Sequence, residues 1–188
     1  MDQPLRPSAP SHLNQVVPGS RSRPTLVSIL AVLHVIGGLA LLLMLLEFGR
    51  QFGAAGPVLG TSPVSAQLSL VLLGVLSLAS GVGMWKGTAW GWWLAGFYYV
   101  YAIYRNANAL LLVASMADQI AGETRDPGYY YVKHVGRVIT HSLVLFYLFR
   151  ESVLAYFGLP QLARRRALLQ LAKPIAALVL IQLLTILW

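Results

Sequence analysis

The sequence predicts an all-α fold, a polytopic membrane helical bundle of four transmembrane helices with a kinked fifth. Hydrophobic residues make up 57% of the 188 positions and charged residues only 11%. This composition leaves too little polar surface to cover a water-soluble domain of this size. Four apolar stretches also reach or exceed the roughly 20 residues that a bilayer core requires, and a fifth apolar stretch ends the chain. Lipid is therefore the expected solvent for most of the chain.

Each element is justified by its local sequence. Residues 1–23 are rich in proline and serine and lack apolar periodicity, so we expect a disordered cytoplasmic tail. Residues 24–157 are expected to form the four-helix bundle, with spans at 24–47, 66–85, 90–117 and 129–157. Residues 158–188 are expected to form a basic linker and a hydrophobic helix. Lys173 and Pro174 interrupt that helix, which predicts either a kinked fifth span or a helix lying in the interface.

Positive charge predicts the orientation. If the spans alternate in direction, most of the basic segments fall on one side of the membrane, and the positive-inside rule makes that side cytoplasmic. The basic residues of that side are Arg6, Arg21, Arg23, Lys86, Arg164, Arg165 and Arg166. Tryptophans at 85, 90, 92 and 93 crowd the short turn on the same side, where amphipathic rings are expected at headgroup level.

Small residues predict the helix contacts. Gly74, Ser77 and Gly81 share one face of the second span, and we expect this face to pack on small residues of the third span, such as Gly91 and Ala95. The turn at residues 86–89 is so short that the second and third spans must be antiparallel neighbours. His34 and Gly38 form a similar notch on the first span.

A polar layer on the third and fourth spans carries the candidate functional residues. On the third span, four polar residues recur at spacings of three, four and three, which places them on one helix face. Charged groups at membrane depth are costly unless they face the bundle interior or find a partner. The candidate ligand-binding residues are Tyr98, Tyr101, Arg105, Asn108, Arg137 and His141. Asn106 lies beside this face, and His134 shares the face of Arg137 on the fourth span.

Two interpretations of this layer stay open. Glu47, or the acidic loop with Asp118, Glu123 and Asp126, could pair with Arg137 in a purely structural salt bridge, and the long arginine stems could also snorkel toward water. Alternatively, two guanidiniums with tyrosine and asparagine donors suit a phosphate, a carboxylate or a lipid headgroup. The second interpretation predicts an anion site.

The histidines suggest a sharper alternative. His34 and His141 are expected to be level across the bundle, and two opposed imidazoles can ligate a haem b. Cysteine is absent, and the histidine spacing lacks a third ligand, so no other metal site is expected.

No catalytic motif is recognisable, which predicts a protein that is not an enzyme. The basic residues flank apolar runs rather than forming a groove, so nucleic acid is not an expected partner. The leading functional hypothesis is a partner-binding or assembly subunit that acts with another membrane protein or as a homo-oligomer. The alternatives are binding or transport of an anionic or lipid-like ligand, and electron transfer through a bis-histidine haem.

Two segments carry a resemblance. RPTLVSILA at 23–31 and GVGMWKGTAWGWWLA at 81–95 resemble small multi-spanning bacterial membrane proteins of unknown function. The resemblance covers the first half of the chain and implies a location in the bacterial plasma membrane. It does not include the polar layer.

Overall fold

The chain is all-helical throughout the residues that the structure, a computed structural model, describes: 22–55, 63–115 and 127–187. The all-α prediction is therefore confirmed for these residues. The helices are α1 (Thr25–Ala55), α2 (Pro63–Lys86), α3 (Ala89–Ser115), α5 (Pro127–Leu148), α6 (Glu151–Tyr156) and α7 (Arg164–Leu187). The predicted N-terminal tail and the acidic loop at 118–126 lie outside the described residues.

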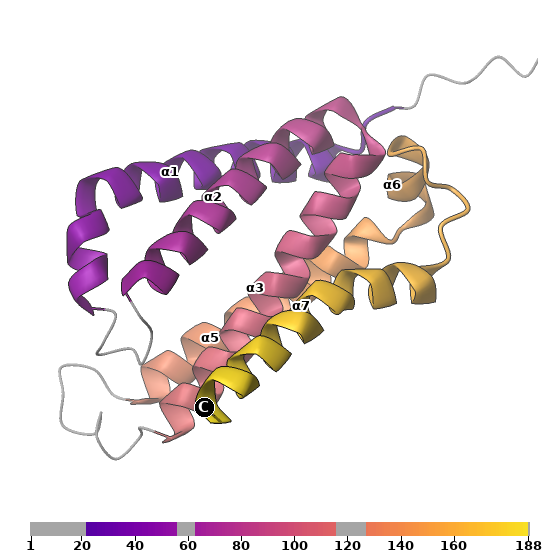
Figure 1. Ribbon diagram of the computed structural model, residues 1–188. Helices are drawn as coiled ribbons and strands as arrows, with labels where there is room; N and C mark the ends of the chain where they lie inside the picture. The colour runs from indigo at the N-terminus through magenta and orange to yellow at the C-terminus, as the bar shows by residue number, and fades with distance from the viewer. Residues whose placement is uncertain (1–21, 56–62, 116–126, 188) are drawn as a thin grey trace, which may run out of the picture.

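The helices form two arms that meet at one end. α1 packs along α2 in the first arm, and α3 packs against α5 and α7 in the second. α2 and α3 join the arms, and Figure 1 shows the arms diverging from the α2–α3 turn. The start of α1, the end of α2, the start of α3, the end of α5 and the start of α7 all lie at this shared end (Figure 1).

The α2–α3 turn is set by Gly87 and Thr88. Gly87 has a φ of 65°, a left-handed conformation that glycine adopts without strain. Its N–H donates to the carbonyl of Met84 and the N–H of Thr88 donates to the carbonyl of Gly83, which is a Schellman motif. The Thr88 hydroxyl then accepts from the N–H of Gly91 and caps α3. The prediction that α2 and α3 are neighbours is confirmed.

The small-residue face of α2 packs on α1, so the predicted pairing of this face with α3 was wrong. A Cβ on Gly38 would lie 2.8 Å from the carbonyl oxygen of Gly74, and one on Gly81 would lie 2.8 Å from the Val35 side chain. α2 meets α3 through another glycine, Gly83, which is in close contact with Gly91. Close backbone approach is the usual role of glycine between membrane helices. The sequence contains enough small residues on α2 for both contacts, so spacing alone could not assign them.

The predicted fourth span is not one helix. α5 ends at Leu148, Arg150 is extended with φ −67° and ψ 141°, and α6 begins at Glu151. The carbonyl of Leu148 accepts a hydrogen bond from the indole nitrogen of Trp92 at 2.9 Å. Trp92 is wholly buried and lies at the end of α5. Its expected place at headgroup level stays a prediction. The last carbonyl groups of a helix have no partner within the helix, and the indole of Trp92 supplies one for Leu148.

The C-terminal helix belongs to the second arm. α7 continues from Arg164 to Leu187 with Pro174 inside it. Ala167, Leu171 and Ile175 are buried at a spacing of four, and Leu171 lies against Gly96 of α3. Because α7 packs along α3, the C-terminal segment is part of the bundle.

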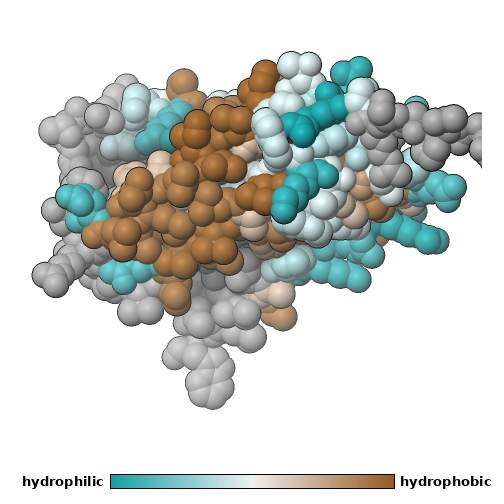
Figure 2. Space-filling model, turned by 90° about the horizontal axis from the view of Figure 1, so that it is seen from above, coloured by the Kyte–Doolittle hydropathy of each residue, from teal (hydrophilic) through white to brown (hydrophobic). Residues whose placement is uncertain are grey.

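Much of the described surface is apolar. α1 contains a stretch, Thr25–Glu47, that is long and apolar enough to cross a membrane, and no other described helix passes the same test. Figure 2 shows an extended hydrophobic face on the molecule. Large apolar side chains are also exposed on the other long helices, among them Leu111 on α3 at 72%, Val132 on α5 at 77% and Phe146 on α5 at 75%. Packing within one copy of the chain leaves these side chains exposed.

Candidate functional site

A closed polar network centres on His34 of α1. The Nδ1 atom of His34 is 2.7 Å from the Ser80 hydroxyl of α2, and its Nε2 atom is 2.7 Å from the Tyr99 hydroxyl of α3. The Ser77 hydroxyl donates to the His34 carbonyl at 2.8 Å. All four residues are buried, and one imidazole thus joins three helices.

The directions of these hydrogen bonds are mutually consistent. The Ser80 hydroxyl donates to the carbonyl of Ser77, so its oxygen accepts from Nδ1–H of His34. Nε2 of the neutral imidazole is then the acceptor for the Tyr99 hydroxyl. No buried side-chain polar atom of the described residues lacks a partner. Both ring nitrogens of His34 are engaged, so the network stabilises one packing of the three helices and leaves the imidazole no free nitrogen for a ligand.

Two adjacent tyrosines separate this network from a second polar region. The rings of Tyr98 and Tyr99 meet edge to face, and both also contact the ring of His34. On its other side, Tyr99 contacts His141 of α5, with 5.8 Å between the ring centroids. The rings of Tyr98 and Tyr99 therefore lie between the His34 imidazole and the second polar region.

The second region is a cavity of about 370 Å³ between the two arms, which we call the crevice. Its polar lining comes from α3 and α5, and each arm adds apolar residues. The lining residues are Leu41, Leu73, Tyr98, Ala102, Arg105, Asn106, Ala109, His134, Arg137 and His141. α1 and α2 contribute Leu41 and Leu73 respectively, so the crevice lies where the arms begin to spread.

Asn106 and His134 link α3 to α5 within the crevice. The Asn106 amide nitrogen donates to the carbonyl of Ala102 at 2.8 Å, and its oxygen accepts from Nδ1 of His134 at 2.9 Å. Since the amide oxygen can only accept, Nδ1 of His134 carries the proton, and Nε2 is left available. Asn106 is buried, whereas His134 is only partly buried. This pair holds the two helices in register beside the arginines.

The crevice is electropositive. Arg105 and Arg137 both line it, and none of its described lining residues is acidic. Glu47 does not line the crevice, and the acidic loop that we expected as an alternative partner lies outside the described residues. Both guanidiniums are accessible, with five N–H donors each, and the Tyr98 hydroxyl and the His141 ring face the same cavity. The arrangement offers an anion several donors from two helices.

The structure brings together four of the six predicted ligand-binding residues. Tyr98, Arg105, Arg137 and His141 line the crevice. Tyr101 does not; its ring stacks on Phe97, with 6.3 Å between centroids and 19° between planes. Asn108 is exposed and also lies outside the crevice lining.

The proposed haem ligands occupy different environments. Both ring nitrogens of His34 are engaged, by Ser80 and Tyr99, so ligation would require one of these hydrogen bonds to break. Tyr99 lies between His34 and His141, in ring contact with both. Bis-histidine haem ligation stays a prediction, and in this arrangement it would require Tyr99 to move.

The predicted ligand-binding set lacked three participants. Tyr99 was passed over because it lies one residue away from the predicted polar face. Asn106 was placed beside that face, and His134 was placed on the face of Arg137 without a ligand-binding role. Ser77 and Ser80 on α2, spaced three apart, were the available signal for a hydrogen-bonding partner of His34. Comparisons with protein-family models, with curated proteins and with solved structures give no match for this chain.

Proposed function

We propose that this protein is a multi-spanning membrane protein that binds a small phosphate- or carboxylate-bearing anion in the crevice. The membrane part is supported by α1, which contains an apolar stretch long enough to span a bilayer, and by the apolar side chains exposed along α3 and α5. Lipid tails would cover these side chains. The bacterial plasma membrane is the proposed location, as the resemblance of residues 23–31 and 81–95 implies.

The distribution of charge supports a cytoplasmic N-terminus in this proposal. Arg23 lies over the Trp85 ring at 4.1 Å and donates to the Tyr156 hydroxyl at 3.1 Å. Tyr156 in turn donates to the carbonyl of Trp85, the residue before Lys86. The start of α1 and the end of α2 therefore share one end of the molecule with the basic start of α7 (Figure 1). By the positive-inside rule this end faces the cytoplasm.

The single observation that carries the anion proposal is the pairing of Arg105 with Arg137 in a cavity whose described lining contains no acid. Two cations that share a partly enclosed space repel each other, and an anion between them relieves this repulsion. Guanidinium forks match the geometry of phosphate and carboxylate oxygens. The contrast with the His34 network supports a binding role, because both ring nitrogens of His34 are already bonded within the protein.

The other functional hypotheses stay predictions. A partner-binding or assembly role is compatible with the apolar surface, as is a role in transport, because the crevice lies between two arms. The binding proposal involves no catalytic step and no resident cofactor.

Membrane topology is tested with reporter fusions. A reporter fused after Met1 or after Arg166 should be cytoplasmic, and one inserted near Pro57 should be external. A fusion after Trp188 then decides whether α7 crosses the bilayer. A cytoplasmic signal at the Pro57 insertion would overturn the proposed orientation.

Anion binding is tested by thermal unfolding of the purified protein in detergent. Sodium phosphate or sodium succinate should raise the Tm by a few degrees relative to sodium chloride at equal ionic strength, because a ligand that binds only the folded state stabilises it. Arg105→Gln and Arg137→Gln should remove most of this rise. Arg105→Lys should retain only part of it, since lysine keeps the charge but loses the fork.

The matched control is Arg165→Gln, which removes the same charge from the start of α7, at a residue outside the crevice lining. Phosphate also stabilises proteins by exclusion from their surface, and this general effect should persist in every variant. An equal rise in Arg105→Gln, Arg137→Gln and Arg165→Gln would contradict a site in the crevice.

A further inference from the structure

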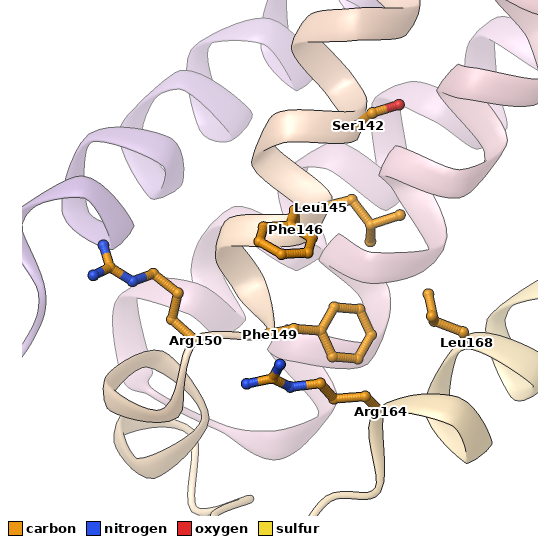
Figure 3. Close-up of a pocket in the computed structure, with 7 residues that line it drawn as sticks. All are labelled: Ser142, Leu145, Phe146, Phe149, Arg150, Arg164 and Leu168. Carbon is orange, nitrogen blue, oxygen red and sulfur yellow. The ribbon is translucent and has the colours of Figure 1, made fainter.

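A second pocket lies at the shared end of the arms, between the end of α5 and the start of α7. It has a volume of about 190 Å³, and its seven lining residues are shown in Figure 3. They are Ser142, Leu145, Phe146, Phe149, Arg150, Arg164 and Leu168. Most of the wall is apolar, and the two arginines are its only charged members. This pocket is separate from the crevice, with which it shares no lining residue.

The break after α5 places Arg150 at this pocket. Because α5 ends at Leu148 and Arg150 is extended, the chain turns away from the axis of α5 at the rim of the pocket. Arg164 comes from the first turn of α7, across the pocket, and in Figure 3 it lies beneath the ring of Phe149. Both arginines are exposed, and Phe149 is buried against Trp92. The charged groups therefore stand at the edge of a fixed apolar surface.

The charge at the start of α7 is unfavourable within the protein itself. α7 begins with Arg164, Arg165 and Arg166 and has no acidic residue in its first turn. The helix dipole places partial positive charge at this end, so acidic residues are the favoured type there. An external anion would compensate both the dipole and the arginines.

We propose that this pocket binds an anionic phospholipid of the surrounding bilayer, with its phosphate on Arg164. The exposed Arg150, whose side chain points away from Phe149 in Figure 3, would turn toward the same phosphate. One acyl chain would then lie against Phe146, Leu145 and Leu168. Phosphate recognition by two guanidiniums beside an apolar wall is the chemistry that such a lipid requires. The inference rests on the proposed membrane location but not on anion binding in the crevice.

The test is native mass spectrometry of the full chain in detergent, titrated with phosphatidylglycerol. The double variant Arg150→Gln/Arg164→Gln should weaken binding about tenfold, as expected for the loss of charge-assisted hydrogen bonds. The matched control is Arg165→Gln/Arg166→Gln, which removes the same amount of charge from the first turn of α7 but from residues outside the pocket lining. The control should retain most of the affinity. Equal losses in both double variants would mean a diffuse basic surface and would overturn the site.

Two further measurements separate the possible ligands. Phe146→Ser should also weaken phosphatidylglycerol binding, because the acyl chain loses its apolar contact. Inorganic phosphate in excess should not displace the lipid; displacement by phosphate together with an inert Phe146→Ser would identify a free-anion site and contradict the lipid proposal.

The proposals for the two sites can be disproved independently of each other. Arg105→Gln should leave phosphatidylglycerol binding unchanged, and Arg150→Gln/Arg164→Gln should keep the rise in Tm with succinate. Loss of lipid binding in Arg105→Gln would contradict a separate lipid site. Normal lipid binding without any succinate effect would refute the crevice proposal alone.

Discussion

The two polar regions on α3 differ in whether their polar side chains already have hydrogen-bonding partners within the protein. At Tyr99, the polar groups of α1, α2 and α3 are buried and bonded to one another. Less than two turns further along α3, Arg105 faces a cavity with Arg137 and no acid among the described lining residues. The first region holds three helices together, and the second lies where the arms separate. The comparison teaches that polar residues on one helix have two distinct roles, which hydrogen-bond satisfaction distinguishes.

The largest effect is expected from removing a hydrogen-bonding group of the His34 network. His34→Leu removes the acceptor of the Tyr99 hydroxyl and the donor to Ser80, leaving a buried hydroxyl without a partner. We expect the free energy of unfolding to fall by about 2 kcal/mol. The fall should appear as a lower Tm, or as unfolding at a lower denaturant concentration, in the same detergent.

A variant in the crevice is the control for this measurement. Arg105→Leu removes a longer and fully charged side chain, yet it leaves no described acid unpaired, so it should lower stability less than His34→Leu. If Arg105→Leu proves the more destabilising of the two, Arg105 has a structural partner and the comparison between the regions fails.

The smallest effects are expected at the two predicted ligand residues that the structure places outside the crevice. Tyr101→Phe keeps the ring that stacks on Phe97, and Asn108→Ala changes an exposed side chain. Each should change stability by less than about 0.5 kcal/mol and leave the succinate-dependent rise in Tm intact.

Tyr98→Phe is the matched change inside the crevice, and it should reduce the succinate effect. A large loss in Tyr101→Phe together with an inert Tyr98→Phe would instead favour the site expected from the helix-face pattern alone. Thermal unfolding of the three variants, with and without succinate, distinguishes these outcomes.

The sequence by itself determined the helical class, the α2–α3 hairpin and the main cations of the crevice. These features depend on local signals. Apolar length predicts a helix, Gly87 followed by Thr88 ends one helix and caps the next, and a spacing of seven between Tyr98 and Arg105 places both on one helix face.

Only the tertiary structure decided which faces meet. Gly74 and Gly81 could have packed on either neighbour of α2, and they pack on α1 because the matching notch at Gly38 allows close backbone contact. The end of α5 at Leu148 depends on a hydrogen bond from Trp92, 56 residues earlier in the chain. Tyr101 lies on the predicted polar face and Tyr99 does not, yet Tyr99 bonds His34 and Tyr101 stacks on Phe97 outside the crevice. Helix periodicity fixes which residues share a face, whereas the rotation of each helix depends on the summed packing of all its neighbours.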